Sequence, residues 1–174
     1  TPLTILHDGF VHLPNTTWKG TGIAIPVFSL RSKHSFGVGE FADIKLLVDW
    51  SKKVKIRLIQ ILPVNDTTAT HSWTDSYPYA AISAFALHPI YLNLEAVAGK
   101  EYSELIKPLK KKQKQLNDLS EVDYEEVLKL KISTLKELFA VMKEEFLQNQ
   151  EYQEFFEKNR YWLVPYAAFC YLRD

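Results

Sequence analysis

The residues between Asp66 and Pro89 have the types and spacing that best suit a chemical site. This segment combines aromatic side chains that carry polar tips with small hydroxyl side chains. Such residues suit a sugar, because aromatic faces stack on the apolar faces of the ring while its hydroxyl groups need hydrogen-bond donors and acceptors. The same composition also suits a well-packed lid of structural tyrosines. The residues alone leave both interpretations open.

A glycine-rich segment offers a second candidate site. Gly37-Val-Gly39-Glu-Phe-Ala-Asp43 has part of a dinucleotide-binding fingerprint, but Asp43 stands where the third glycine belongs. We therefore interpret it as a tight turn that introduces a helix at Phe41, with the glycines relieving backbone strain.

The sequence gives little support for a metal site or for a catalytic nucleophile. The histidines show no pairing of the HxxxH kind, so we expect no metal site and no cofactor; they are His7, His12, His34, His71 and His88. Ser83 lies in Ile-Ser-Ala rather than in a GxSxG turn, which argues against a nucleophile elbow. Cys170 is the only cysteine, so no intramolecular disulfide is possible, and we interpret it as a small buried residue on a helical face.

Composition excludes several classes of partner. The 174 residues include 21 basic and 21 acidic side chains, so the chain has no broad charge that would attract nucleic acid or an anionic membrane. No apolar run approaches the ~20 residues of a membrane span, and no signal peptide is visible. We expect a cytoplasmic protein without nucleic-acid or membrane partners. Because the chain starts at Thr1 and its only methionine is Met142, we expect a processed chain or a piece of something larger.

The elements that must position the Asp66–Pro89 segment form a predicted βαβ unit. Residues 22–28 and 58–62 are short apolar runs typical of strands buried on both faces, and apolar residues at helical spacing follow Phe41. The two strands should be parallel. The polar stretch from Pro63 to Pro78 leaves the carboxyl end of the second strand, where α/β barrels build their sites. Residues 79–94 should form a short helix and then an extended piece.

The remainder of the chain is predicted to be helical. Only 15 of residues 1–99 are charged, against 27 of residues 100–174, and all six glycines lie in the first part. Asp123 and Glu126 have the spacing of a capping box, which predicts a helix from there through Phe146. Two further helices are expected over residues 152–156 and 162–172, with Pro165 near the first turn of the second or kinking it. The lysine-rich run 107–114 is interpreted as a solvated loop or helix edge.

Several motifs, in a characteristic order and spacing, carry a resemblance to one family. They are Gly22-Ile-Ala-Ile-Pro-Val-Phe-Ser-Leu-Arg-Ser32, Phe36-Gly-Val-Gly-Glu-Phe-Ala-Asp-Ile44, Gln60-Ile-Leu-Pro-Val-Asn-Asp66, Asp75-Ser-Tyr-Pro-Tyr79 and Ser83-Ala-Phe-Ala-Leu-His-Pro89. They resemble the amino-terminal part of the catalytic domain of 4-alpha-glucanotransferases, the amylomaltase or disproportionating-enzyme family (glycoside hydrolase family 77). The likeness is dense over residues 18–99 and less distinctive beyond.

The resemblance implies an α/β fold class: an incomplete (β/α)8 TIM-barrel fragment holding the first two strands, with a mostly helical inserted subdomain. Residues 1–20 would be a connector from an upstream module, 21–99 the first βαβ part with its substrate loop, and 100–174 the helical subdomain. The activity implied is transfer of α-1,4-glucan segments between maltooligosaccharides by a retaining double displacement. Two carboxyl groups about 5–5.5 Å apart perform that reaction, with a sugar replacing water in the second step.

The resemblance also places substrate-binding residues, but no catalytic ones, in this chain. Tyr79 resembles the tyrosine that stacks beside the sugar at the cleavage point, and Tyr77 and Ser76 occupy neighbouring substrate-lining positions. The nucleophile of the family lies in an Arg-x-Asp-His motif that does not occur here, so no catalytic residue is assigned. Of the remaining acidic candidates, Asp43 and Asp49 are interpreted as helix-surface charges; the other two are Asp66 and Asp75.

Three hypotheses follow. The chain is part of a 4-alpha-glucanotransferase with its catalytic carboxylates elsewhere; alternatively it is a non-catalytic carbohydrate-binding module, or a helical protein-interaction module that uses residues 100–174. Under the first hypothesis the isolated chain should have no glucan-transfer activity. Its strands would keep open edges, so we expect it to self-associate, to rearrange the loop around residues 67–76, or both.

Overall fold

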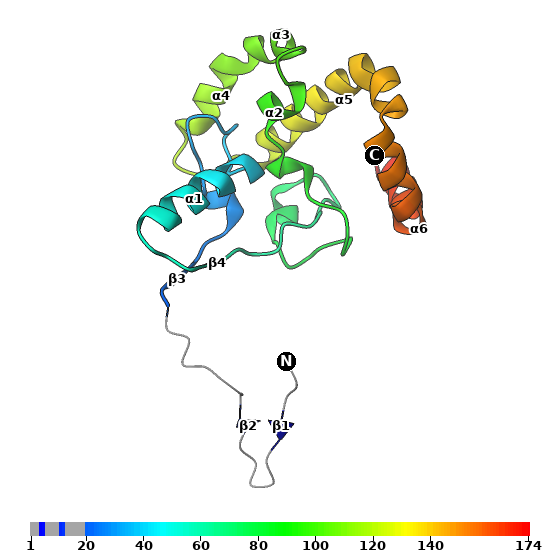
Figure 1. Ribbon diagram of the computed structural model, residues 1–174. Helices are drawn as coiled ribbons and strands as arrows, with labels where there is room; N and C mark the ends of the chain where they lie inside the picture. The colour runs from blue at the N-terminus through cyan, green and yellow to red at the C-terminus, as the bar shows by residue number, and fades with distance from the viewer. Residues whose placement is uncertain (1–3, 6–10, 13–19) are drawn as a thin grey trace.

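The computed structural model describes residues 4–5, 11–12 and 20–174 (Figure 1). Strands β1 (Thr4–Ile5) and β2 (Val11–His12) pair antiparallel. The predicted connector over residues 1–20 lies almost wholly outside the described residues. The described body is mostly helical with a small two-stranded parallel sheet, which is compatible with a fragment of an α/β fold.

The predicted βαβ unit is present. Strand β3 (Gly22–Ala24) and strand β4 (Leu58–Gln60) pair in parallel, and helix α1 (Phe41–Lys53) connects them. Both strands are shorter than predicted. Strand β3 ends early because Pro26 has no N–H for the ladder and the 3-10 turn η1 (Val27–Ser29) follows it directly, and β4 ends with the partner strand that it pairs with. The prediction that both faces of these strands are buried was wrong for this chain. The first and last residues of each strand are exposed and share one face of the sheet, because that face is not covered by another layer.

Helix α1 begins with a capping hydrogen bond that the sequence analysis missed. The Glu40 N–H donates to Asp43 Oδ2 at 2.8 Å, and the Asp43 N–H donates to the main-chain carbonyl of Glu40 at 2.9 Å. Ser35 Oγ donates to the same Asp43 oxygen at 2.9 Å. The interpretation of Asp43 as a surface charge was therefore wrong, because its carboxylate is buried and completes the start of the helix. Asp49 is exposed, as expected.

The glycine-rich segment forms the tight turn that its sequence predicted. Gly37 has a φ of 77°, a conformation that side chains rarely adopt, and Gly39 lies against backbone atoms of Val27 and Leu30. The Gly39 N–H donates to the Phe28 carbonyl at 3.0 Å. This turn brings η1 and the start of α1 together.

The predicted short helix within residues 79–94 is absent. The chain there is irregular as far as the 3-10 turn η3 (Pro89–Tyr91), and α2 (Leu94–Ala98) begins where an extended piece was expected. The cause is backbone pairing with the segment that follows β4. The His88 N–H donates to the Val64 carbonyl and the Asp66 N–H to the Ala86 carbonyl, both at 2.9 Å, which requires extended backbone.

The chain beyond Gly99 is helical, as predicted. Its elements are α3 (Ser103–Ile106), the 3-10 turn η4 (Lys107–Leu109), α4 (Lys110–Asn117), α5 (Tyr124–Gln148) and α6 (Gln150–Arg173). The lysine-rich run spans η4 and the start of α4. The prediction of two separate helices over residues 152–156 and 162–172 was wrong, because the single helix α6 spans both ranges and contains Pro165. Residues 157–161, between the two predicted helices, are mostly exposed and are compatible with a helix.

The capping box predicted at the start of α5 is only half formed. Asp123 Oδ1 accepts the Glu126 N–H at 3.1 Å. The Glu126 carboxylate instead pairs with the Lys112 ammonium at 2.7 Å. Asp123 therefore caps α5, while Glu126 joins it to α4.

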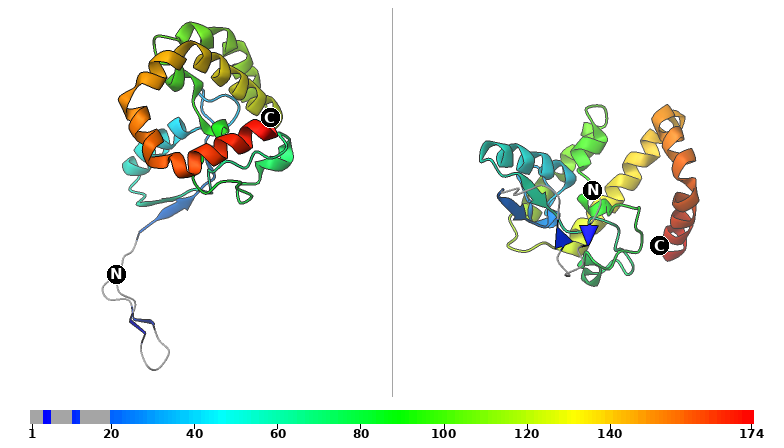
Figure 2. Two further views of the ribbon diagram at one scale, coloured as in Figure 1. Left: turned by 90° about the vertical axis from the view of Figure 1, so that its right-hand side faces the viewer. Right: turned by 60° about the horizontal axis from the view of Figure 1, so that its bottom comes forward.

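The hydrophobic core joins the two halves of the chain. Val27, Val38 and Ile90 pack in one cluster with Leu116 and Val127, which lie beyond Gly99. The boundary near Gly99 thus does not separate two cores, and the proposed domain limits stay a prediction. Figure 2 shows α6 returning beside the loop that follows β4. Among the described residues, no helix combines the length and apolar character needed to cross a membrane.

Candidate functional site

The segment singled out by its chemistry forms a closed loop at the carboxyl end of β4. The Ile82 N–H donates to the Asp66 carbonyl at 2.8 Å, so the two ends of the loop meet. Within it, the 3-10 turn η2 (Trp73–Ser76) ends at the first predicted substrate residue, Ser76, and directly precedes Tyr77 and Tyr79. Compact loops of this kind often carry function.

Asp75 organises this loop from inside. Its Oδ2 accepts the N–H groups of Ala69 at 3.0 Å, Thr70 at 2.8 Å and His71 at 2.7 Å. Burial raises the pKa of Asp75, but these hydrogen bonds outweigh burial and hold its pKa below the ordinary value. The carboxylate is therefore an acceptor for backbone amides and is not available as an acid.

Asp66 joins the loop to α6. The Tyr166 hydroxyl donates to Asp66 Oδ2 at 2.5 Å, and the Thr68 hydroxyl donates to Oδ1 at 2.6 Å. The Arg173 guanidinium lies 3.7 Å from Oδ2 and donates to the Thr68 carbonyl at 2.7 Å. Burial and the hydrogen bond to Asp66 raise the pKa of Tyr166. Both acidic residues of the loop are thus occupied in holding structure.

An aromatic contact docks α6 on the same side of the molecule. The rings of Phe85 and Trp162 stack with centroids 5.3 Å apart, and Tyr161 meets the edge of Phe85 at 6.0 Å. These contacts bring α6 beside the loop although the segments are far apart in sequence.

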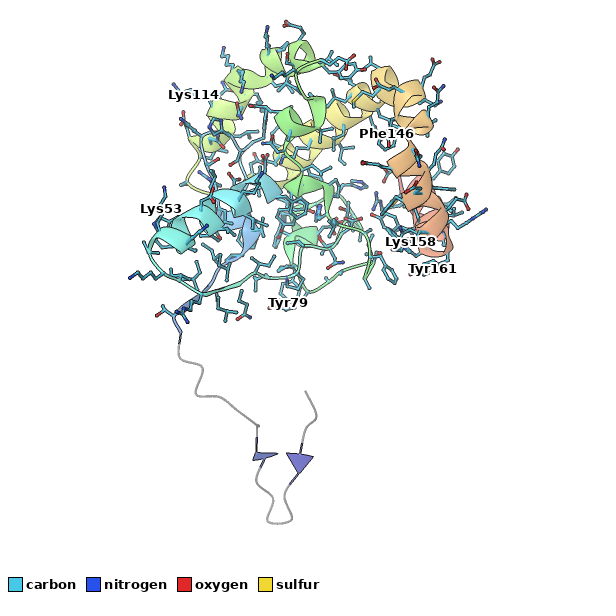
Figure 3. The ribbon with its side chains drawn as sticks, in the orientation of Figure 1. Lys53, Tyr79, Lys114, Phe146, Lys158 and Tyr161 are labelled. Atoms are coloured by element: carbon cyan, nitrogen blue, oxygen red, sulfur yellow. The ribbon has the colours of Figure 1, made fainter. Side chains whose placement is uncertain are left out.

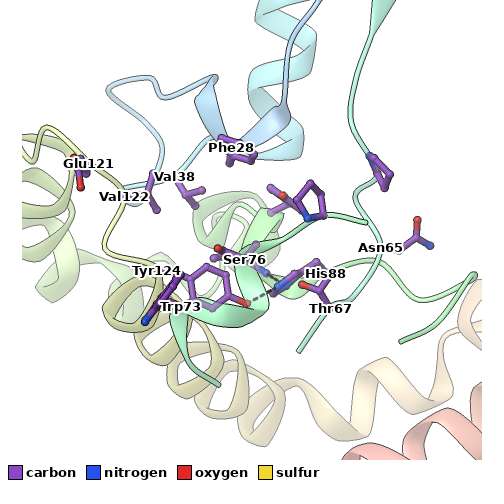
Figure 4. A pocket seen from close by; sticks show the side chains of 14 residues that line it. Phe28, Val38, Asn65, Thr67, Trp73, Ser76, His88, Glu121, Val122 and Tyr124 are labelled. Atoms are coloured by element: carbon purple, nitrogen blue, oxygen red, sulfur yellow. Dashed lines mark hydrogen bonds between the residues drawn. The ribbon is translucent and has the colours of Figure 1, made fainter. Parts of the chain in front are cut away.

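A cavity of about 420 Å³ lies between the loop, η1 and the start of α5 (Figure 4). Its walls are mainly apolar and carry a few polar groups. Residues that line it include Phe28, Thr67, Trp73, Ser76, His88 and Tyr124. A pocket of this size, with aromatic walls and few polar groups, suits a small organic ligand.

His88 is a buried polar residue in the wall of this cavity. Its Nδ1 accepts the Ile90 N–H at 3.2 Å, so its proton lies on Nε2, which donates to the Tyr124 hydroxyl at 2.9 Å. Burial lowers the pKa of His88 to about 4, against a smaller opposing effect of Asp66. Burial also raises the pKa of Tyr124 to about 12. His88 is therefore neutral near pH 7.

The low pKa of His88 predicts acid lability. The unfolded chain binds a proton at His88 below pH ~6.5, whereas the folded chain does so only below about 4, so stability falls as the pH drops through that window. From these values we expect His88 to contribute a loss of about 2 kcal/mol between pH 7 and pH 5. Urea denaturation at both pH values measures it. His88→Asn keeps an acceptor for the Ile90 N–H and should show a weaker pH dependence; identical slopes for variant and wild type would contradict the prediction.

The structure separates the predicted substrate residues into two places. Ser76 lines the cavity. Tyr77 and Tyr79 are each 61% exposed, and their rings contact each other with centroids 5.6 Å apart. Figure 3 shows Tyr79 at the outer edge of the body, pointing away from it. The two tyrosines form an aromatic pair beside the cavity rather than inside it, and their binding role stays a prediction.

The sequence analysis missed Trp73, His88 and Tyr124 as lining residues. Trp73 is 69% exposed, and its main-chain N–H donates to Glu125 Oε1 at 3.0 Å. Trp73 and His88 belong to the segment between Asp66 and Pro89, whose aromatic and polar composition could have indicated them as lining residues. Tyr124 lay outside it, and only the packing of α5 brings this residue to the loop.

The described part of the chain holds no group of three or more His, Cys, Asp or Glu side chains arranged to bind a metal ion. Cys170 is half-buried on α6 rather than fully buried as expected.

Comparison with known proteins gives a consistent result. A family profile described as 4-alpha-glucanotransferase matches residues 25–174. The rice protein "4-alpha-glucanotransferase DPE2" (Oryza sativa subsp. japonica) is 44% identical over 170 residues, which cover 98% of this chain and 18% of the rice protein. The "4-alpha-glucanotransferase" of Chlamydia muridarum is 38% identical over 154 residues, covering 88% of this chain and 28% of that protein.

The chain thus spans less than a third of the length of these two relatives. The family match nevertheless includes α1, β4, the loop with its cavity and the helices that follow. This chain belongs to the 4-alpha-glucanotransferase family.

Proposed function

We propose that the chain is the amino-terminal part of the catalytic domain of an enzyme that transfers α-1,4-glucan segments between maltooligosaccharides by a retaining double displacement. The observation that carries the proposal is the family match over residues 25–174, together with relatives that are named 4-alpha-glucanotransferase. In this proposal β3 and β4 are the first two strands of a TIM barrel, and the catalytic carboxylates lie outside the chain.

The occupied acidic residues support placing the chemistry elsewhere. A double displacement needs a free carboxylate nucleophile and a carboxylic acid about 5–5.5 Å apart. Asp75 accepts three backbone N–H groups, and Asp66 accepts two hydroxyl groups next to a guanidinium. The contribution of this chain is then to bind the glucan and to exclude water from one side of the site.

Product chromatography tests this function. The full-length protein, incubated with maltotriose, should yield both longer and shorter maltooligosaccharides. The isolated 174-residue chain should yield neither, because it supplies no carboxylate pair. Disproportionation by the isolated chain would refute the location of the chemistry, and no disproportionation by the full-length protein would refute the function.

Tyr79 provides the sharpest prediction for binding. In the full-length enzyme, Tyr79→Ala should lower kcat/KM for transfer by about tenfold, because it removes an exposed stacking face for a sugar ring. Tyr79→Phe keeps the ring and should retain most of the activity. Tyr171 on α6 is 85% exposed and provides a matched control, since Tyr171→Ala removes a similarly exposed ring that lies outside the predicted substrate motif. Transfer by Tyr79→Ala within twofold of wild type would end the assignment.

The proposal includes a cytoplasmic location and self-association of the isolated chain. The single cysteine is compatible with a reducing compartment. Apolar surface next to the sheet supports association, since Leu58 on β4 is 53% exposed and Ile61 just beyond it is 37% exposed.

A further inference from the structure

We infer that Asp75 is a positioning residue for the proposed glucan site: its carboxylate sets the shape of the loop, and thereby the place of Ser76, Tyr77 and Tyr79. This inference rests on the proposed function. It concerns a residue that contacts neither a sugar nor the reacting atoms, and acts through the residues that follow it.

The side chain of Asp75 accepts most of the hydrogen bonds that hold residues 69–71 of the loop. Three successive N–H groups, from residues 69–71, converge on Oδ2, and the Thr70 hydroxyl donates to Oδ1 at 3.1 Å. The residue is only 6% exposed, so water does not supply these bonds. Without the carboxylate, three backbone donors would lose their shared acceptor.

The loop adopts a shape that local preferences do not favour. His71 has a φ of 61°, a region that a non-glycine residue enters only at a cost of about 1–2 kcal/mol. The hydrogen bond from the His71 N–H to Asp75, at 2.7 Å, is the shortest of the three amide bonds and holds this conformation. The carboxylate therefore compensates for strain that the loop would otherwise release.

The main chain of Asp75 transmits this constraint to the substrate motif. Its carbonyl accepts the Thr67 hydroxyl, and its N–H donates to the Ser72 carbonyl at 3.0 Å. The next residue, Ser76, lines the cavity, and the Tyr77–Tyr79 pair follows at once. Since residue 75 is held by side chain and main chain alike, loss of the carboxylate should displace the residues directly after it.

Two substitutions in the full-length enzyme separate positioning from other roles. Asp75→Ala removes the acceptor and should lower kcat/KM for maltotriose transfer by about tenfold or more, because displacement by about 1 Å is enough for large losses. Asp75→Asn can place its carbonyl oxygen at the Oδ2 position and donate its NH2 to the Thr70 hydroxyl, so it should keep most of the activity. Asp49→Ala, which removes an exposed carboxylate from α1, is the matched control.

The readouts must distinguish positioning from simple destabilisation. We expect Asp75→Ala to change KM and kcat at a temperature where thermal unfolding shows the variant to be folded. An Asp75→Ala enzyme that is folded and within twofold of wild type would overturn the inference. An Asp75→Asn enzyme as impaired as Asp75→Ala would also overturn it, since a required charge rather than hydrogen-bonded positioning would then be at work.

If Asp75→Ala does not fold, a second variant tests the inference. Thr70→Val removes the hydroxyl that donates to Oδ1 and leaves the backbone amides in place. It should lower kcat/KM by about two- to fivefold, as one of four bonds to the carboxylate is lost; unchanged kinetics would overturn the inference. A wild-type enzyme without transfer activity would refute the proposed function instead, so the two failures are distinguishable.

Discussion

Replacing Lys131 with methionine should destabilise the folded protein by about 3–5 kcal/mol, the range found when one partner of a buried ion pair is removed. The Lys131 ammonium lies 2.5 Å from Glu40 Oε1 and donates to the carbonyls of Ile90 at 2.6 Å and Leu92 at 2.8 Å. Both charged side chains are fully buried. The variant leaves the Glu40 carboxylate and two carbonyls without their donor, and urea denaturation at pH 7 measures the loss.

The cost should depend on pH in a defined direction. Burial raises the pKa of Glu40, an effect that Lys131 opposes, and burial lowers the pKa of Lys131 in turn. Without Lys131, Glu40 becomes easier to protonate in the folded state. A carboxyl whose folded pKa is raised loses stability as the pH rises, so the difference between variant and wild type should shrink as the pH falls toward 5.

Two further variants control this prediction. Lys129→Met changes an exposed lysine two residues away on α5 and should have little effect on stability. The double variant Glu40→Gln/Lys131→Met removes both charges and should recover part of the loss, because no uncompensated charge stays buried. Equal stability of Lys129→Met and Lys131→Met would contradict the importance of the ion pair.

Gly39→Ala should cost about 3 kcal/mol, the upper end for overpacking a rigid site. A Cβ atom on Gly39 would lie 1.9 Å from the Val27 carbonyl oxygen and 2.7 Å from the Leu30 nitrogen. Both neighbours are backbone atoms of η1 and its C-cap, so no flexible side chain can move aside. The expected result is a lower urea midpoint, with a disturbed contact between η1 and the start of α1.

Gly99→Ala is the matched control for Gly39→Ala. A Cβ on Gly99 would meet no atom within 4 Å, although its φ of 60° is strained for alanine. Because a φ of 60° with a ψ of −159° is a conformation that essentially only glycine adopts, this variant should lose about 1–3 kcal/mol, from backbone strain alone. A Gly99→Ala variant less stable than Gly39→Ala would show that conformational strain outweighs the backbone contact.

Features encoded by neighbouring residues were predictable from the sequence. The apolar spacing after Phe41 and after Asp123 predicted α1 and α5, because a helix repeats every 3.6 residues and shows its buried face in the order of its side chains. The parallel pairing of β3 and β4 followed from the strand–helix–strand order. The loop after β4 stood out by composition, and the family resemblance of its motifs agrees with the match over residues 25–174.

Local patterns failed where charge and burial coincide. Asp43 looks like a surface charge between apolar helix residues, and Lys131 looks like any lysine of a charged helix. Lys131 is buried only in the packed chain, because its partner Glu40 lies 91 residues away, whereas Asp43 is held by Ser35 and Glu40 within its own segment. The predicted helix within residues 79–94 failed for a similar reason, since its backbone bonds go to residues 64–66 instead.

The candidate site likewise has features that the sequence predicted and features that only tertiary packing produced. Ser76, Tyr77 and Tyr79 were named from the resemblance of their motif to the family, and their contact with a sugar stays a prediction. The arrangement around them depends on distant partners: Tyr124 reaches His88 from 36 residues away, and Tyr166 reaches Asp66 from 100 residues away. The sequence therefore predicted candidate glucan-binding side chains without their arrangement. The cavity, and the occupation of Asp66 and Asp75 by hydrogen bonds, arise only when α5 and α6 pack against the loop, because burial is a property of contacts between segments.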